Sequence, residues 1–180
     1  MSEFNQMQEI KRRFFAMRNG IVAETIRRGG LQYKMVFGLN LPQIAEIAEG
    51  LPHTQELAEQ LWADSRTRES MMIAPMLYPR ERLTRERASE MLRESPTTEV
   101  TDILCHRLLR HEPYALELAT EASTSAESLI RYGAFRLMFN LLYTHPSEIR
   151  PFVEAEASCN HPLTLPLCRA MLEELDFMDS

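Results

Sequence analysis

Apolar residues recur every three or four positions along almost the whole chain, which is the period of an amphipathic helix. In the central stretch 95–110 the apolar positions fall on one helical face: Val100, Ile103, Leu104 and Leu108. Ser95 is a favourable N-cap residue and Pro96 suits the first helical position, so we predict one helix over 95–110. Asp102 lies off the apolar stripe of this helix, on a side that it shares with Glu99 and His106.

The same period predicts ten further helices and no strand. They cover residues 4–18, 21–28, 41–49, 53–63, 66–77, 82–94, 113–121, 125–143, 146–157 and 162–175. Asn40 and Gln43 have the spacing of a capping box, and so do Thr124 and Glu127, which predicts two helix starts. The link between residues 28 and 41 has no helical period. The pattern therefore predicts an all-α protein.

A weak internal repeat supports a stacked arrangement of these helices. Glu56-Leu57-Ala58 recurs as Glu117-Leu118-Ala119, and Met76-Leu77 meets Leu137-Met138 at the same offset. Such an offset suits two helix-pair repeats of about thirty residues each, although chance matching among Leu- and Ala-rich helices is the alternative. The 180 residues favour one domain over 1–180. We predict an α-solenoid of antiparallel helix pairs, whose curvature forms a concave groove for a partner.

Charge is unevenly spread along the chain. The net charge is −6, yet residues 1–93 carry 14 Lys and Arg against 12 Asp and Glu, and residues 94–180 carry 6 against 14. The basic clusters are Lys11–Arg13, Arg27–Arg28, Arg66–Arg68 and Arg80–Arg87. A surface for nucleic acid would therefore lie on the N-terminal half. The alternative is that these clusters are ordinary solvated helix faces.

Cysteine and glycine usage limits the possible chemistry. The three cysteines cannot all pair internally, and the chain starts without a secretory signal pattern, which predicts a cytoplasmic protein. Cys159, His161 and Cys168 match no closed zinc spacing, and the glycines form no phosphate loop, so we expect no metal and no cofactor. Cys105 and His106 are adjacent on a helix and point apart, so they do not form a nucleophile–base pair.

Asp102 has two interpretations. In the first it is a surface charge or an (i, i+4) partner of His106. In the second it lines a groove and stabilises an oxocarbenium-like transition state, as cleavage of a glycosidic bond requires.

Three stretches make the chain resemble a known family. They are Phe37-Gly38-Leu39-Asn40-Leu41-Pro42 followed by IAEIAE, the helix-pair segment LAEQLWADSRTRESMMIA over 57–74, and TEVTD over 98–102. Residues 111–143 are similar to the next repeat. Over about residues 27–143 the chain resembles the HEAT-like-repeat DNA alkylation repair family, the alkylpurine DNA glycosylases of the AlkC/AlkD group, as a short, divergent member.

The resemblance implies a right-handed solenoid of HEAT-like repeats that binds double-stranded DNA, damaged or distorted, and excises N-alkylated purines without a metal. By position in the motifs, Asp102 is the catalytic carboxylate and Arg131 contacts DNA. Among the arginines of the N-terminal half, we expect Arg68 to contact DNA as well. Thr98 stands where the family motif begins with Trp, and Trp62 is the only tryptophan of the chain. We therefore expect excision that is weak or lost. The rival hypothesis is a non-enzymatic HEAT-repeat scaffold that binds a protein or peptide.

Overall fold

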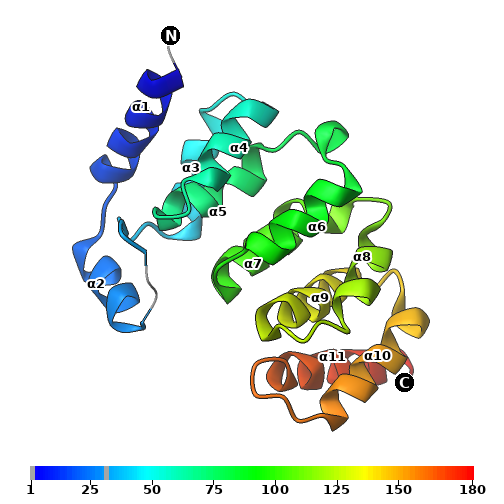
Figure 1. Ribbon diagram of the computed structural model, residues 1–180. Coiled ribbons are helices and arrows are strands. Elements are labelled where there is room, and N and C mark those ends of the chain that lie inside the picture. Colours follow the sequence, from blue (N-terminus) through cyan, green and yellow to red (C-terminus); the bar gives the residue numbers. More distant parts are fainter. Residues whose placement is uncertain (1–2, 31–32) are drawn as a thin grey trace. The chain divides into compact units, whose positions relative to one another are not determined.

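The computed structural model describes residues 3–30 and 33–180, and over these residues the protein is all-α (Figure 1). The only extended pairing in the described part is a single bridge between Met35 and Thr67. The predicted all-α class is thus confirmed, while the right-handed α-solenoid of antiparallel helix pairs stays a prediction. The chain divides into two compact units, Met1–Arg82 and Leu83–Ser180, which are called unit 1 and unit 2.

Unit 1 contains five α-helices and one short 3-10 helix among its described residues. They are α1 (Glu3–Ala16), α2 (Gly20–Arg28), α3 (Leu41–Glu49), α4 (Gln55–Ala63), α5 (Arg68–Leu77) and η1 (Arg80–Arg82). Both α3 and α4 pack against α5. The capping box before α3 is confirmed, because the Asn40 side chain accepts from Gln43 N and the Gln43 side chain accepts from Asn40 N, each at 2.9 Å. Trp62 is buried in this core.

A buried carboxylate holds the link before α3. Glu69 of α5 has no exposed surface and accepts hydrogen bonds from the backbone N–H groups of the link segment Phe37-Gly38-Leu39, at 3.1, 2.9 and 3.4 Å. Its charge is balanced by Arg68, whose NH1 lies 2.9 Å from Oε1 and 3.0 Å from the Leu39 carbonyl oxygen. This side chain thus satisfies backbone donors that have no helical partner.

The same link requires a glycine at position 38. Gly38 has φ +78°, which is left-handed backbone. A Cβ atom there would lie 2.3 Å from the Asn19 carbonyl oxygen and 2.7 Å from Ala23 N, both backbone atoms of the α1–α2 turn and α2. Gly38 therefore allows the link to run directly against α2.

Unit 2 contains six α-helices and one 3-10 helix. They are α6 (Arg85–Glu94), α7 (Thr98–Arg107), η2 (Leu109–His111), α8 (Ala115–Ala122), α9 (Ser128–Leu141), α10 (Pro146–Ser158) and α11 (Leu165–Met178). The main packed pairs are α8 with α9, α7 with α9, and α10 with α11. The α9 helix contacts all the other α-helices named in these pairs and α6 as well, so it is central to the unit.

The helix starts predicted at 82, 95, 113, 125 and 162 in unit 2 all lie two or three residues too early. Two of them show the physical reason. The helix predicted over 95–110 begins as α7 at Thr98, with Thr97 as the N-cap that accepts from Val100 N. Ser95 instead ends α6, and its hydroxyl bonds the Thr101 hydroxyl at 2.9 Å inside the core. The capping box at Thr124 does not form, because α9 begins later, after Glu127, and the Thr124 hydroxyl bonds the Glu121 carbonyl instead.

No helix among the described residues is long and apolar enough to cross a membrane.

The prediction of one domain over 1–180 depends on how the two units associate, and it stays a prediction.

Candidate functional site

Asp102 lies half-buried on α7 and faces α9. Its Oδ1 accepts a hydrogen bond from the Tyr132 hydroxyl at 2.8 Å. The Arg136 Nε atom lies 3.2 Å from the same oxygen. Tyr132 and Arg136 are four residues apart on α9, so they are on one face of that helix and present a donor and a cation to one carboxylate. Asp102 therefore pairs with residues of α9, and no hydrogen bond joins it to His106 of its own helix.

Small side chains allow α7 and α9 to come this close. Gly133 lies inside α9, where an added Cβ atom would lie 3.0 Å from Thr101 Cγ2 of α7 and 2.6 Å from Leu92 Cδ1 of α6. Glycine inside a helix costs about 1 kcal/mol relative to alanine, so close approach is the physical reason for it here. The Cys105 thiol of α7 also donates to the Gly133 carbonyl, with 3.5 Å between sulfur and oxygen.

Polar residues continue along both helices and form what we call the Asp102 stripe, which consists of Asp102 and His106 on α7 and Tyr132, Arg136 and Asn140 on α9. His106 Nδ1 lies 3.2 Å from the Asn140 Oδ1 atom. The Asn140 amide also donates to the Arg136 carbonyl at 2.9 Å. The stripe is thus ordered by contacts across the two helices and along α9.

Burial dominates the electrostatics of Asp102. It raises the pKa of this carboxyl above the ordinary aspartate value, while the hydrogen bond from Tyr132 and the charge of Arg136 lower it and Glu99 raises it. Burial, and next the hydrogen bond to Asp102, raise the pKa of Tyr132, which keeps its phenol protonated as the donor. Burial also strongly raises the pKa of Cys105, so its thiol is neutral and suited to packing.

One side of the Asp102 carboxylate remains open. Tyr132 and Arg136 both approach Oδ1, and no hydrogen bond from any described residue reaches Oδ2. The carboxylate side chain keeps 35% of its surface exposed. Arg136 Nε is itself buried and is close to Oδ1 without hydrogen-bond geometry, so the pair is an ion pair only. Such a carboxylate is positioned through one oxygen and can face a cationic group with the other.

Arg131 is held away from Asp102. Its Nε donates to Glu156 Oε1 and its NH1 donates to the Ser125 carbonyl, both at 3.1 Å. Glu156 of α10 is buried and also accepts from the Thr164 hydroxyl. The structure therefore brings Arg136, and not Arg131, to Asp102. The predicted DNA contact of Arg131 stays a prediction.

Arg68 does not fit its predicted DNA contact. Its side chain is 4% exposed, and it is neutralised by Glu69 and bonded to the Leu39 carbonyl. A guanidinium enclosed in this way cannot reach a phosphate without unfolding the link. Arg68 is a structural residue of unit 1.

Tyr132 and Arg136 were not predicted from the sequence. The signal for them is the sequence YGAFR itself, in which a hydroxyl and a cation are spaced by four residues inside an otherwise apolar helix. A buried charge in such a setting requires a partner. What the sequence does not state is that the partner is on α7.

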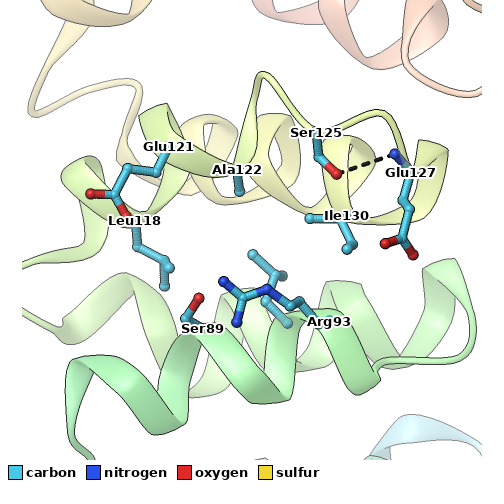
Figure 2. Close-up of a pocket in the computed structure, with 9 residues that line it drawn as sticks. Ser89, Arg93, Leu118, Glu121, Ala122, Ser125, Glu127 and Ile130 are labelled. Carbon is cyan, nitrogen blue, oxygen red and sulfur yellow. Dashed lines mark hydrogen bonds between the residues drawn. The ribbon is translucent and has the colours of Figure 1, made fainter.

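A hollow lies between α6 and the segment from α8 to the start of α9 (Figure 2). Its volume is about 230 Å³, and it is lined by Ser89, Leu92, Arg93, Leu118, Glu121, Ala122, Ser125, Glu127 and Ile130. Figure 2 shows the Arg93 side chain extending through this space from α6. Arg93 forms no hydrogen bond or ion pair with a residue in the described part of the chain. The lining thus combines one cation, two carboxylates and apolar side chains.

Comparison with known proteins adds no identification, because no family model, no curated protein and no solved structure matches this chain. Within residues 3–30 and 33–180, no group of three or more His, Cys, Asp or Glu side chains is arranged to hold a metal ion.

Proposed function

We propose that this chain is a DNA alkylation repair-type protein, a DNA-binding homologue of the alkylpurine DNA glycosylases, built from HEAT-like helix pairs in a right-handed α-solenoid. The observation that carries the proposal is the half-buried Asp102 carboxylate, fixed through Oδ1 and open at Oδ2. The proposal also rests on the sequence motifs that resemble this family. Its ligand is double-stranded DNA, damaged or distorted.

The chemistry follows from the charge on the substrate. An N-alkylated purine is cationic, and when its glycosidic bond breaks the bonding electrons pass to the purine and leave positive charge on the deoxyribose. A carboxylate next to the sugar stabilises that charge. Water then adds at the anomeric carbon and releases a proton. In this proposal Asp102 provides the carboxylate, and Tyr132 and Arg136 fix its orientation.

The part of the family's site that this chain does not match is the surface that binds the alkylated base. Thr98 lies one turn before Asp102 on α7 and offers no aromatic face to a cationic base. A cation–π contact with an aromatic ring is worth about 0.5–2 kcal/mol. Its loss lowers affinity for the cationic lesion, so we propose weak or lost excision together with retained DNA binding.

The test is release of methylated bases from alkylated duplex DNA at high enzyme concentration. Wild type is expected to release 3-methyladenine or 7-methylguanine slowly, and Asp102→Asn is expected to lower the rate by about 100-fold or to background. Glu86→Gln makes the same charge change on an exposed position of α6 and should keep the wild-type rate. Equal rates for wild type and Asp102→Asn, or no release by wild type, would remove the enzymatic role.

DNA binding is tested separately. Affinity for duplex DNA should fall steeply with salt, because phosphate contacts release counterions. Binding that is absent at low salt would remove the nucleic-acid proposal as well.

The second candidate function is a non-enzymatic scaffold for a protein or peptide. It is favoured by the mixed lining of the α6–α8 hollow, where Arg93 lies near Glu121 and Glu127, since a nucleic-acid surface would lack the carboxylates. Arg93→Glu should abolish capture of a peptide ligand and leave duplex affinity within about twofold. The opposite result would favour the DNA role.

A further inference from the structure

Unit 1 contains a cationic pocket that the Asp102 site does not involve. It has a volume of about 340 Å³ and lies between the end of α1, α2 and the link before α3. It is lined by Phe15, Arg18, Gly20, Ala23, Arg27, Lys34, Met35, Val36 and Phe37. This volume falls within the ~300–1,000 Å³ of small-molecule sites.

The charge of the pocket has one sign. Arg18, Arg27 and Lys34 line it, and none of the described lining residues is acidic. Two carboxylates outside the lining contact it. Glu24 lies 4.0 Å from Arg27 and closer to Arg28, at 3.1 Å. Glu69 accepts from Phe37 N at 3.1 Å, and its charge is balanced by Arg68. Because the whole chain has a net charge of −6, three cations around one hollow are a local feature. Such a hollow attracts an anion.

The three cations differ in how many of their N–H donors already form hydrogen bonds within the protein. Arg27 donates from NH2 to the Val36 carbonyl at 3.2 Å, so it also holds the link. Arg18 donates from NH1 to the Phe15 carbonyl at 2.9 Å, and its Nε and NH2 have no hydrogen bond within the described residues. Lys34 is exposed and has no ion pair with a residue in that part of the chain. Arg18 and Lys34 therefore retain donors for a ligand.

The pocket also presents a planar apolar surface. Phe15 is 55% exposed, and the Arg18 guanidinium lies 3.8 Å from the centre of its ring. Phe37 adds a second ring, held in place by Phe14 at 5.7 Å between centroids. Aromatic and guanidinium planes are the surfaces on which unpaired bases stack, at about 1–3 kcal/mol per base.

We propose that this pocket binds one nucleotide unit, with its phosphate on Arg18 and Lys34 and its base against the Phe15 surface. The nucleotide is either free or an unpaired residue of a nucleic-acid strand. The inference depends only on unit 1, so it can fail while the Asp102 proposal stands, and the reverse is also true.

The experiment measures binding to the full chain by fluorescence anisotropy, with a 5′-phosphorylated, dye-labelled thymidine pentamer as the probe. Unlabelled AMP, inorganic phosphate and a blunt duplex are the competitors. We expect saturable binding that the unlabelled pentamer displaces. Displacement by AMP at similar concentration identifies a free nucleotide, whereas displacement by the pentamer alone identifies an unpaired strand residue.

Charge-reversal variants locate the site. Arg18→Glu and Lys34→Glu are each expected to weaken pentamer binding about tenfold, and Phe15→Ala about fivefold or more, since stacking and phosphate contacts both contribute. Arg12→Glu is the matched control, because Arg12 is exposed on α1 and lies outside the lining. It should change affinity less than twofold. Circular dichroism verifies that all four variants are folded.

Three results would overturn the proposal. One is the absence of saturable binding to the pentamer. Another is an equal loss for Arg12→Glu and Lys34→Glu, which would mean diffuse attraction without a pocket. The last is binding to vesicles of phosphatidylserine and phosphatidylcholine with none to the pentamer, which would make Phe15, Ile21 and Val22, all exposed, a membrane-surface contact instead.

Discussion

Two carboxylates, one in each unit, show how burial and bonding separate a structural acid from a candidate functional one. Glu69 is fully buried, and its two oxygens accept three backbone N–H bonds and one bond from Arg68. Asp102 is half-buried, and only one of its oxygens is bonded. The first acid has no remaining capacity for a ligand. The second has an open oxygen whose orientation is already fixed.

The largest expected difference between the two acids is in stability. Glu69→Gln removes the carboxylate that lies 2.9 Å from the buried Arg68 guanidinium, and removing one member of a buried ion pair costs about 3–5 kcal/mol. Urea unfolding followed by circular dichroism measures this loss. Glu49→Gln is the control, because Glu49 is exposed at the end of α3 and should change the unfolding free energy by less than about 0.5 kcal/mol. A Glu69→Gln protein as stable as the control would contradict the structural role.

The next largest loss of stability is expected from a substitution in the link that Glu69 holds. Gly38→Ala combines left-handed strain with contacts of 2.3 and 2.7 Å to backbone atoms, and we expect a loss of about 3 kcal/mol. Gly30 has φ +83°, and a Cβ atom added there would have nothing within 4 Å. Gly30→Ala should therefore cost only the strain, about 1–2 kcal/mol. Equal thermal unfolding shifts for the two variants would show that the close approach at Gly38 has no energetic weight.

A smaller effect of opposite sign is expected at Asp102. Burial holds the pKa of Asp102 in the folded state above its value in the unfolded chain, so ionisation of this carboxyl opposes folding. The free energy of unfolding therefore falls as pH rises from the unfolded-state pKa through the folded-state pKa. Asp102→Asn should therefore be no less stable than wild type at pH 7, and its advantage should shrink below the unfolded pKa. Paired urea titrations at pH 3.5 and pH 7 measure this. A variant that is clearly destabilised at pH 7 would make Asp102 a structural acid like Glu69.

The smallest expected effect is a change in pKa alone. Tyr132→Phe removes the hydrogen bond that favours the ionised carboxyl, so the pKa of Asp102 should rise further. Carbon-13 NMR titration of the Asp102 carboxyl follows it. Tyr143→Phe is the control, because the exposed Tyr143 donates to Glu174 at 2.7 Å and lies in the same unit. If both variants left the Asp102 pKa unchanged, Tyr132 would have no role in tuning the carboxyl.

Helical periodicity predicted the all-α class and most of the helices because their burial pattern is local in sequence. The capping box at Asn40 was also predictable, since both of its members are three residues apart and bond only each other's backbone. The start of α7 was missed because Thr97 offers the same kind of acceptor as Ser95, and the choice depends on Thr101, which bonds Ser95 in the core.

The partner of Asp102 could not be predicted in the same way. Neighbouring helical positions point about 100° apart, so Arg131 faces Glu156 while Tyr132 faces Asp102. Which of these faces meets α7 is a property of packing and has no local signature. The sequence identified the carboxylate, and the contacts across the two helices identify its companions.

Gly133 places the Asp102 site under the control of a residue that has no side chain. A side chain at position 133 would meet Leu92 Cδ1 of α6 and Thr101 Cγ2 of α7. Any shift of α9 that relieved these contacts would move Tyr132 and Arg136 together, because both are on that helix. Such a shift would loosen both contacts to Asp102 at once and leave its carboxylate more exposed to solvent. Among natural variants of this chain, the identity of residue 133 should therefore forecast whether Tyr132 and Arg136 still contact the carboxylate.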